Sequence, residues 1–457
     1  MKASFKILIL LLALTVLFFQ CEKDPELQLV DIPDNLFLNA LIELGVDTDG
    51  DGQISVTEAE IVTVIDVNSR YGQEDITDMT GIEKFVNLDT LICDYNQILT
   101  LDVSNNTALK YLDCSHNDLS TLDVSNNMLL EYLDCRHNQI ITLDVSNNLS
   151  LEYFDCGLNQ LIFLNVSNNN ALEKLICWAN QLTTLDVSNN TALVFLNCGS
   201  NEFTSLDVSN NTALVVLDCG GNQITTLDVS NNLSLEYFDC GDNQFTSLDV
   251  SNNTALEYFY CGSNQLIALD VSSNTALVVL NCGSNEFTSL NVSNNTTLEY
   301  FDCGRNQLIT LDVSNNEELL DLRCDNNQLT SLNVSKNTLL EELHCYTNQL
   351  TNIEFSNNTG LIILDCAKNL LTNLDLTNLL DLHILDCRDN QLTSLDLSNN
   401  SRMGPVEHLY YPACELDIRN MPSLEEVCVW TMPFPPEGFK LCMDGSPNVF
   451  FTTECSK

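Results

Sequence analysis

One spacing governs most of this chain, because cysteine recurs at intervals of 21 residues without interruption. Fifteen cysteines share the phase, at positions 93, 114, 135, 156, 177, 198, 219, 240, 261, 282, 303, 324, 345, 366 and 387. An asparagine lies three residues after each of them, from Asn96 to Asn390. A fixed period of this length predicts an array of stacked repeats, in which no single repeat buries its apolar face alone.

The repeat around Cys114 shows how each unit is built. Leu112 and Cys114 alternate with Tyr111 and Asp113, and this period of two is typical of a half-buried strand. Strands stacked in parallel about 4.8 Å apart would bury their leucines in one continuous core. We expect the repeated asparagine, such as Asn117, to turn inward and bond to loop backbone groups.

The motif LxxLxCxxNxL followed by xxLDVSNN resembles leucine-rich repeats, and specifically the bacterial 21-residue subclass known as the IRREKO type. The resemblance implies a repeat solenoid of mostly parallel β-strands with short loops, placed at residues 61–402, with about fifteen 21-residue coils and a cap at each end. Cysteines side by side on parallel strands suit neither disulfide torsions nor zinc, for which histidine partners are missing. We therefore expect a buried column of thiols that pack as small apolar groups.

The N-terminus has the features of an export signal. Two lysines precede an apolar run from Ile7 to Phe19, which is too short to span a bilayer. Cys21 and an acidic stretch follow, and this resembles a bacterial lipoprotein signal. The resemblance implies that residues 1–20 are removed, that Cys21 is acylated, and that residues 21–30 form an acidic tether on the outer membrane, facing the cell exterior. The alternative is an ordinary signal peptide with a stray cysteine.

A twelve-residue stretch from Asp47 to Glu58 matches the calcium loop of an EF-hand. Its expected calcium ligands are Asp47, Asp49, Asp51, Gln53 and Glu58. A helix with Asp31 as its N-cap should precede the loop, whereas the residues after the loop favour a strand. We therefore predict a calcium-bound cap over residues 31–60 without the second long helix of a calcium sensor; the alternative is an acidic surface turn.

The repeat pattern ends near residue 402. Residues 403–457 carry seven prolines and four cysteines outside the 21-residue phase, and we interpret them as a cap that shields the last coil. The four cysteines, Cys414, Cys428, Cys442 and Cys455, allow three pairings. We expect one or two disulfides in an exported cap, with the pairing left open.

The charge balance and the missing motifs exclude two classes of function. With 17 Lys+Arg against 64 Asp+Glu, the formal charge is −47, and such a surface repels nucleic acid. The sequence contains no nucleophile elbow, zincin motif, phosphate loop or dinucleotide fingerprint. Aspartates recur at one position of eleven coils, from Asp102 to Asp396, whereas catalysis needs a unique pair of carboxyl groups. We therefore expect that the protein is not an enzyme. Neighbouring aspartates of this column would repel each other, and hydrogen bonds or cations must offset that repulsion.

Aromatic rings beside carboxylates mark the outward side of the predicted strands. The candidate ligand-binding residues are Tyr111, Tyr132, Tyr153, Tyr237, Tyr258, Tyr300, Asp134, Asp155 and Asp239. Tyrosine offers rigid contact area and aspartate offers hydrogen-bond acceptors, although neighbouring rings can also merely stabilise a sheet. The sequence therefore favours a non-enzymatic, lipid-anchored cell-surface protein that binds a protein or a glycan. The alternatives are a structural coat or spacer, and an accessory protein of polysaccharide processing.

Overall fold

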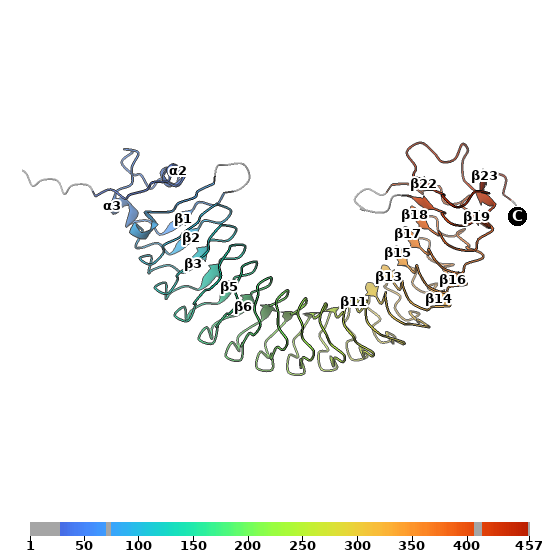
Figure 1. The fold of residues 1–457 in the computed structure, drawn as a ribbon, viewed down its shortest axis with the longest axis horizontal. Helices are drawn as coiled ribbons and strands as arrows, with labels where there is room; N and C mark the ends of the chain where they lie inside the picture. Colours follow the sequence, from blue (N-terminus) through green and yellow to red (C-terminus); the bar gives the residue numbers. More distant parts are fainter. Residues whose placement is uncertain (1–27, 70–74, 406–413, 456–457) are drawn as a thin grey trace, which may run out of the picture. The chain divides into compact units, whose positions relative to one another are not determined.

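The computed structural model describes residues 28–69, 75–405 and 414–455 (Figure 1). The predicted signal peptide, Cys21 and most of the acidic tether lie outside the described residues. Within the described residues, none of the helices has the length and apolar character needed to cross a membrane. The chain divides into two units, which are taken in turn.

The unit Met1–Leu151 contains the N-terminal cap and the first coils of the solenoid. Its elements are helices α2 (Asn35–Glu43) and α3 (Val56–Ala59), strand β1 (Val64–Asp66), the 3-10 helix η1 (Ile82–Lys84), and strands β2 (Thr90–Ile92), β3 (Tyr111–Asp113) and β4 (Tyr132–Asp134). The four strands pair in parallel in chain order. Because α3 has only four residues and leads into β1, the prediction that no long helix follows the loop is confirmed.

The cap helix begins later than predicted. Asp34, and not Asp31, is the N-cap of α2, and its Oδ1 accepts hydrogen bonds from the N–H groups of Leu36 and Phe37 at 2.8 and 3.2 Å. A proline lies between Asp31 and the helix, and it disfavours helical geometry in the residue before it. The Oδ2 atom of Asp34 accepts a bond from the Thr77 N–H at 3.0 Å, so one carboxylate joins the helix to the segment before β2.

The unit Glu152–Lys457 is a solenoid of parallel strands, as predicted. Its main sheet has fourteen strands: β5 (Tyr153–Asp155), β6 (Lys174–Ile176), β7 (Phe195–Asn197), β8 (Val216–Asp218), β9 (Tyr237–Asp239), β10 (Tyr258–Tyr260), β11 (Val279–Asn281), β12 (Tyr300–Asp302), β13 (Asp321–Arg323), β15 (Glu342–His344), β17 (Ile363–Asp365), β18 (Ile384–Asp386), β20 (Leu416–Asp417) and β22 (Leu441–Cys442). The repeat length sets the register, so that Tyr237 lies opposite Tyr258 and Phe238 opposite Phe259.

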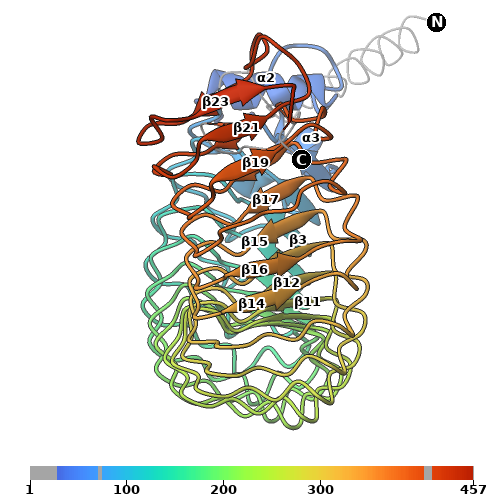
Figure 2. The same cartoon turned by 90° about the vertical axis from the view of Figure 1, so that its right-hand side faces the viewer.

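Further short strands lie on the other side of the coils (Figure 2). They are β14 (Ser331–Asn333) paired with β16 (Asn352–Glu354), and the set β19 (Ser394–Asp396), β21 (Glu426–Cys428) and β23 (Phe450–Thr452). Residues 403–457, which were expected to form only a cap, thus continue both sheets. Leu416 and Val427 explain this, because they remain fully buried at strand positions although the loops no longer keep the 21-residue spacing.

The asparagine of each repeat binds two coils together, as predicted. The Nδ2 of Asn264 donates to the carbonyl groups of Cys240, Cys261 and Gly262 at 3.1, 3.1 and 3.2 Å. Its Oδ1 accepts a bond from the Phe245 N–H at 3.0 Å. The buried amide therefore satisfies loop groups that the strand ladder leaves free.

The fifteen repeat cysteines are free and buried, which confirms their packing role. Burial raises the pKa of the Cys177 thiol to about 12, because the apolar surroundings cannot solvate a thiolate. Thiol oxidation and metal binding need the thiolate, so these side chains behave as small apolar groups.

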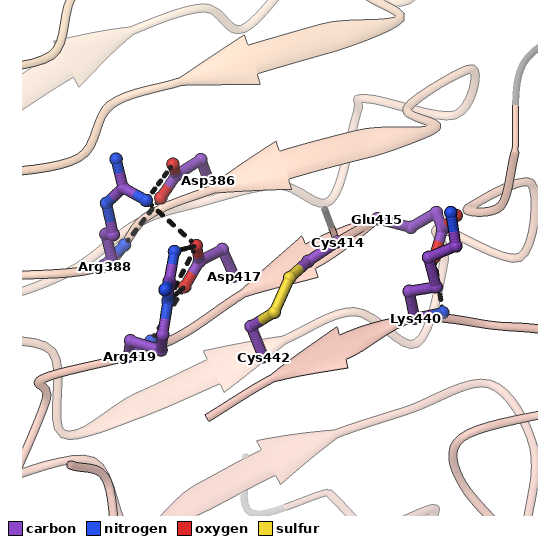
Figure 3. Close-up of a disulfide and its surroundings, with 8 residues drawn as sticks. All are labelled: Asp386, Arg388, Cys414, Glu415, Asp417, Arg419, Lys440 and Cys442. Carbon is purple, nitrogen blue, oxygen red and sulfur yellow. Dashed lines mark hydrogen bonds and ion pairs between the residues drawn. A yellow bond between two sulfur atoms is a disulfide. The ribbon is translucent and has the colours of Figure 1, made fainter. Parts of the chain in front are cut away.

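Two disulfides cross-link the C-terminal coils, in agreement with the one or two expected. They join Cys414 to Cys442 and Cys428 to Cys455. The first bond links Cys414, two residues before β20, to the end of β22 (Figure 3). It therefore connects two successive coils whose hydrogen-bonded overlap is only two residues long.

A group of ion pairs lies beside the first disulfide (Figure 3). Arg388 Nη1 lies 3.5 Å from Asp386 Oδ2 and 3.2 Å from Asp417 Oδ2. Burial raises the pKa of Asp386 to about 7, and the nearby carboxylates of Asp365 and Asp417 add to this effect although Arg388 opposes it. One arginine thus holds together carboxylates of two coils that would otherwise repel each other.

Candidate ligand-binding face

The predicted binding residues are divided between the two units of the chain. Tyr111, Tyr132 and Asp134 belong to the unit Met1–Leu151, and Tyr153, Asp155, Tyr237, Asp239, Tyr258 and Tyr300 belong to Glu152–Lys457. Each lies on a repeat strand, and the tyrosines fall into groups that differ in packing. The groups are therefore described separately.

Tyr111 and Tyr132 form a closed stack. Their ring centroids lie 4.0 Å apart, their planes differ by 8°, and both side chains are half-buried. Stacked rings on neighbouring strands stabilise a sheet and cover each other's faces. This pair fits the structural interpretation of the aromatic stripe better than a binding role.

Tyr153 is engaged by a cation. Lys174 Nζ lies 5.2 Å from the ring centroid of Tyr153 and 4.4 Å from that of Phe195. The three side chains occupy successive strands β5, β6 and β7. Cation–π contacts on both sides of Lys174 place Tyr153 in a local ladder that is separated from Tyr237 by strands β6 to β8.

Tyrosines of β9 and β10 form an open cluster. The ring centroids of Tyr237 and Tyr258 are 6.3 Å apart with planes tilted by 31°, and Tyr260 lies 5.5 Å from Tyr237. Tyr258 is 38% exposed. A hollow of about 410 Å³, here called the tyrosine hollow, is lined by Phe195, Val216, Tyr237 and Tyr258 together with Glu236 and Glu257.

Two of the tyrosines, Tyr237 and Tyr300, have hydroxyl groups with raised pKa values. Burial, reinforced by the carboxylates of Asp239 and Asp302, raises the pKa of Tyr237 and Tyr300 to about 12. Both phenols are therefore neutral hydrogen-bond donors at neutral pH. Arg323 also lies over the Tyr300 ring, with Cζ 5.5 Å from the centroid.

Asp134 and Asp155 were predicted to bind ligand, but each is only 1% exposed and offers little of its carboxylate to solvent. Asp134 Oδ1 accepts a bond from the Arg136 N–H at 3.1 Å, and Asp155 Oδ1 accepts one from the Gly157 N–H at 2.9 Å. The carboxylates turn back onto their own loops instead of pointing to solvent. Asp239 makes the same bond with Gly241 but is only partly buried, and it remains a candidate.

Sequence reasoning missed a groove that lies beside these strands. Six successive coils carry glycine directly after the repeat cysteine, namely Gly199, Gly220, Gly241, Gly262, Gly283 and Gly304. Two hollows of about 240 and 400 Å³ lie over these glycines and share Asp239, Gly241 and Asp242. Trp178 lines the first and Tyr346 the second, and the groove between them is here called the glycine trough. The glycine run was visible in the sequence and was the signal that could have revealed it.

The aspartate column on the other side of the coils is stabilised as expected. Asp228 Oδ1 accepts a bond from the Ser230 N–H at 2.9 Å. The Ser230 hydroxyl and this N–H together lower the pKa of Asp228. Hydrogen bonding within each loop therefore offsets the repulsion between rungs.

The predicted calcium loop brings three of its five ligands together. Asp47, Asp49 and Glu58 each offer one carboxylate oxygen within 4.8 Å of the others. Glu58 is buried and accepts bonds from Ser55 N–H and Thr48 N–H at 2.9 and 2.7 Å. These bonds, led by the one from Ser55, lower the pKa of Glu58 to about 2, so a charged acceptor is held at the loop end.

Asp51, the fourth predicted carboxylate ligand, lies outside this group. Asp51 Oδ1 accepts a bond from the Gln53 N–H at 2.8 Å and is not among the three clustered carboxylates. Hard cations such as calcium prefer oxygen ligands, and the clustered set consists of oxygens only. The residues therefore fit calcium, with Asp51 as the carboxylate that would have to move.

A solved structure with a similar column of thiols provides the decisive comparison. The functional domain of InlJ from Listeria monocytogenes, described as including a cysteine ladder, is 34% identical, covers 81% of this chain and 84% of that chain, and has a TM-score of 0.72. The chain belongs to the leucine-rich repeat family that includes InlJ. The predicted fold class is thereby confirmed.

Two further comparisons bear on this leucine-rich repeat protein. Internalin J of Listeria monocytogenes is 43% identical over 53 residues, a match that spans 12% of this chain and 6% of that protein. The Arabidopsis receptor kinase HAESA, solved with the peptide hormone IDA and the co-receptor SERK1, has a TM-score of 0.65 over 88% of this chain and 73% of that chain. At 18% identity the second likeness shows the fold alone. No family model matches the chain.

Proposed function

We propose that this chain is a non-enzymatic, lipid-anchored protein of the bacterial cell surface that binds a protein or glycan ligand through the strand face of its solenoid. The tyrosine hollow carries the proposal. Tyr237 and Tyr258 surround it, while the core below is already filled by Phe238 and Phe259, which are fully buried. Aromatic rings that are not needed to fill a core and that line a surface hollow are typical anchors of binding sites.

The proposed location rests on the N-terminal sequence. The apolar run ending before Cys21 supports export, and the cysteine supports attachment of lipid. Each acyl chain contributes about 0.8 kcal/mol for each buried CH₂ group, and stable attachment to a membrane needs more than one such chain or a second signal. The acidic residues after Cys21 favour the outer membrane and its external face.

The absence of catalysis is part of the proposal. Asp218, Asp239 and Asp302 all lie at the same repeat position and bond to glycine N–H groups in the same way, at 3.1, 2.9 and 2.9 Å. An acid and a base in one active site need environments that separate their pKa values. Equivalent rungs of a ladder supply binding groups more readily than such a pair.

We also propose that calcium binds in the cap. Asp47, Asp49 and Glu58 would hold the ion, and Asp51 with the Gln53 carbonyl would complete the ligand set. Bound calcium would supply positive charge among carboxylates that otherwise repel. The chain itself contributes the geometry, because the Glu58 carboxylate joins the loop end to Thr48 at its start. The site would thus fix the segment that leads into β1.

A structural coat or spacer remains the second candidate. The closed stack of Tyr111 on Tyr132 favours it, because such a ring pair needs no ligand to explain it. The two candidates make different predictions for the tyrosine hollow: a binding protein needs it to capture a ligand, whereas a spacer does not.

The test is a binding screen with the mature, lipid-bearing chain in detergent. It should be incubated with glycan arrays and with secreted proteins, and each ligand found should be tested again with a Tyr237→Ser, Tyr258→Ser double variant. We expect at least one ligand whose capture depends on these rings. Capture of no ligand, or capture that the double variant leaves unchanged, would favour the spacer.

A further inference from the structure

The glycine trough is bordered by carboxylates and amides of the neighbouring coils. A Cβ atom added at Gly220 would lie 3.0 Å from Asp239 Oδ1, and one at Gly262 would lie 2.8 Å from Asn281 Oδ1. In other coils the same position carries Arg136, Trp178 or Tyr346. The repeat therefore accepts large residues here, and the run of glycines is a local departure that opens the surface.

Two carboxylates of the trough, Asp239 and Asp302, each use one oxygen in a hydrogen bond within the protein. Asp239 Oδ1 accepts the Gly241 N–H at 2.9 Å, and Asp302 Oδ1 accepts the Gly304 N–H at 2.9 Å. Over the residues that the structure describes, no protein group donates a hydrogen bond to the second oxygen of either carboxylate. Both aspartates line the groove, so these acceptors are available to a bound molecule.

The backbone of the trough floor is already paired. The carbonyl of Gly241 accepts the Gly221 N–H at 2.9 Å, and that of Gly262 accepts the Asp242 N–H at 2.9 Å. Because the coils use these groups among themselves, a ligand cannot add to the floor as a further strand. Recognition must come from the side chains along the trough.

Charge along the trough is uneven. Five aspartates and two arginines line it: Asp218, Asp239, Asp242, Asp302, Asp325, Arg305 and Arg323. Both arginines line the hollow that contains Tyr346, whereas the hollow that contains Trp178 is lined by three of the aspartates and by no lysine or arginine. Burial and the neighbouring Asp239 raise the pKa of Asp218 to about 6, so negative charge there is held at a cost.

We propose that the glycine trough binds an extended polypeptide segment rich in lysine or arginine, an inference that rests on the proposed binding function and specifies its partner. Cations on the segment would supply the countercharge that the Trp178 half lacks, and the Trp178 ring offers a cation–π contact. A neutral glycan would leave that charge uncompensated. The trough runs over nine coils from Trp178 to Tyr346, and its eight intervals of about 4.8 Å accommodate roughly twelve extended residues.

The first experiment measures binding of fluorescein-labelled dodecalysine to the full chain in detergent at low salt. An Asp218→Asn, Asp239→Asn double variant should weaken binding about tenfold, because it removes two trough charges. Asp228→Asn, Asp249→Asn is the matched control, since it makes the same change of charge in the same coils on the other side. We expect this control to bind like the parent chain.

Three results would overturn the proposal. The first is that dodecalysine does not bind. The second is that both double variants lose affinity equally, which would make the attraction a property of net charge. A neutral oligosaccharide such as cellohexaose displaces the peptide from the parent chain, which would make the trough a glycan site. Loss of ligand capture in the Tyr237→Ser, Tyr258→Ser variant, in the absence of dodecalysine binding, would leave the proposed function standing while this inference fails.

A second variant tests the trough without changing any charge. Gly241→Trp should fill the groove, and the fold accepts tryptophan at the equivalent position of Trp178. An added Cβ at Gly241 meets its nearest atom at 3.3 Å, which small adjustments can relieve. We expect about tenfold weaker dodecalysine binding with a melting temperature close to that of the parent chain. Unchanged affinity in a folded variant would place the peptide elsewhere.

Discussion

The rings of Tyr237 and Tyr258 are tilted by 31° with centroids 6.3 Å apart, whereas those of Tyr111 and Tyr132 are stacked at 4.0 Å and 8°. The same residue type at the same repeat position thus packs in two ways. The stacked pair covers its own ring faces, while the tilted pair borders the tyrosine hollow. We therefore place the proposed aromatic binding site at β9 and β10 and not along the whole stripe.

Removal of one clustered carboxylate should abolish the effect of calcium on the cap. A ligand that binds only the folded form stabilises it by about 2.7 kcal/mol at a hundred times its dissociation constant. Millimolar calcium should therefore slow amide hydrogen exchange in residues 47–58, and Asp49→Asn should lose most of this protection. Glu60→Gln, at an exposed position just after the loop, is the control. Equal exchange rates in calcium and in chelator would rule the site out.

The lipid anchor depends on one thiol. Cys21→Ala should abolish metabolic labelling with a fatty-acid analogue and shift the protein from the membrane fraction to the soluble fraction. A Ser4→Ala variant, within the segment expected to be removed, should be labelled as before. Persistent labelling of the Cys21→Ala protein would show that the lipoprotein interpretation is wrong.

The fifteen repeat cysteines should not react with thiol reagents in the folded protein. Burial raises the pKa of these thiols, to about 12 at Cys177, and thiol reagents react with the thiolate. A maleimide should therefore label none of the fifteen ladder cysteines until denaturant is added, when all fifteen should react. Mass spectrometry of the intact protein provides the count. Stoichiometric labelling without denaturant would contradict the packing role.

Asp386 should make the C-terminal coils less stable as the pH rises. Its pKa is raised to about 7 in the folded protein, against about 4 for an unfolded aspartate. Its contribution to stability is therefore fully present below about pH 4 and is lost as the pH rises through 7. Asp386→Asn should flatten the fall in melting temperature between pH 5 and 8, whereas Asp396→Asn, an exposed carboxylate of the same coil, should not. Parallel curves for all three proteins would contradict this assignment.

Sequence patterns predicted what the repeat period controls. Because parallel strands in one register place identical positions side by side, the roles of Cys261 and Asn264 followed from the spacing alone. The burial of individual side chains was harder to predict. Alternation along a strand gives the face on which Asp155 lies, but the bond to Gly157, which turns the carboxylate inward, depends on a loop whose conformation the pattern does not specify. The glycine trough could have been predicted, because the run of glycines after the repeat cysteines is visible in the sequence.

Helix starts and coil boundaries were the other weak point. Asp31 and Asp34 both suit an N-cap; Asp34 takes this role after Pro33, and its bond to Thr77 is a long-range contact that no local pattern contains. At the other end the loss of the 21-residue period suggested that the solenoid had stopped. The buried position of Leu416 in β20 shows that strands can continue to stack when the loops between them change length.

The most direct test of the central claim compares two pairs of tyrosines in one assay. Tyr237→Ser with Tyr258→Ser should weaken ligand capture at least tenfold, about 1.4 kcal/mol, with little change in melting temperature, because these rings border an open hollow. Tyr111→Ser with Tyr132→Ser should do the reverse, since it removes a closed stack. Should the first pair lower the melting temperature and leave capture unchanged, the tyrosine hollow is scaffolding and the account of binding is wrong.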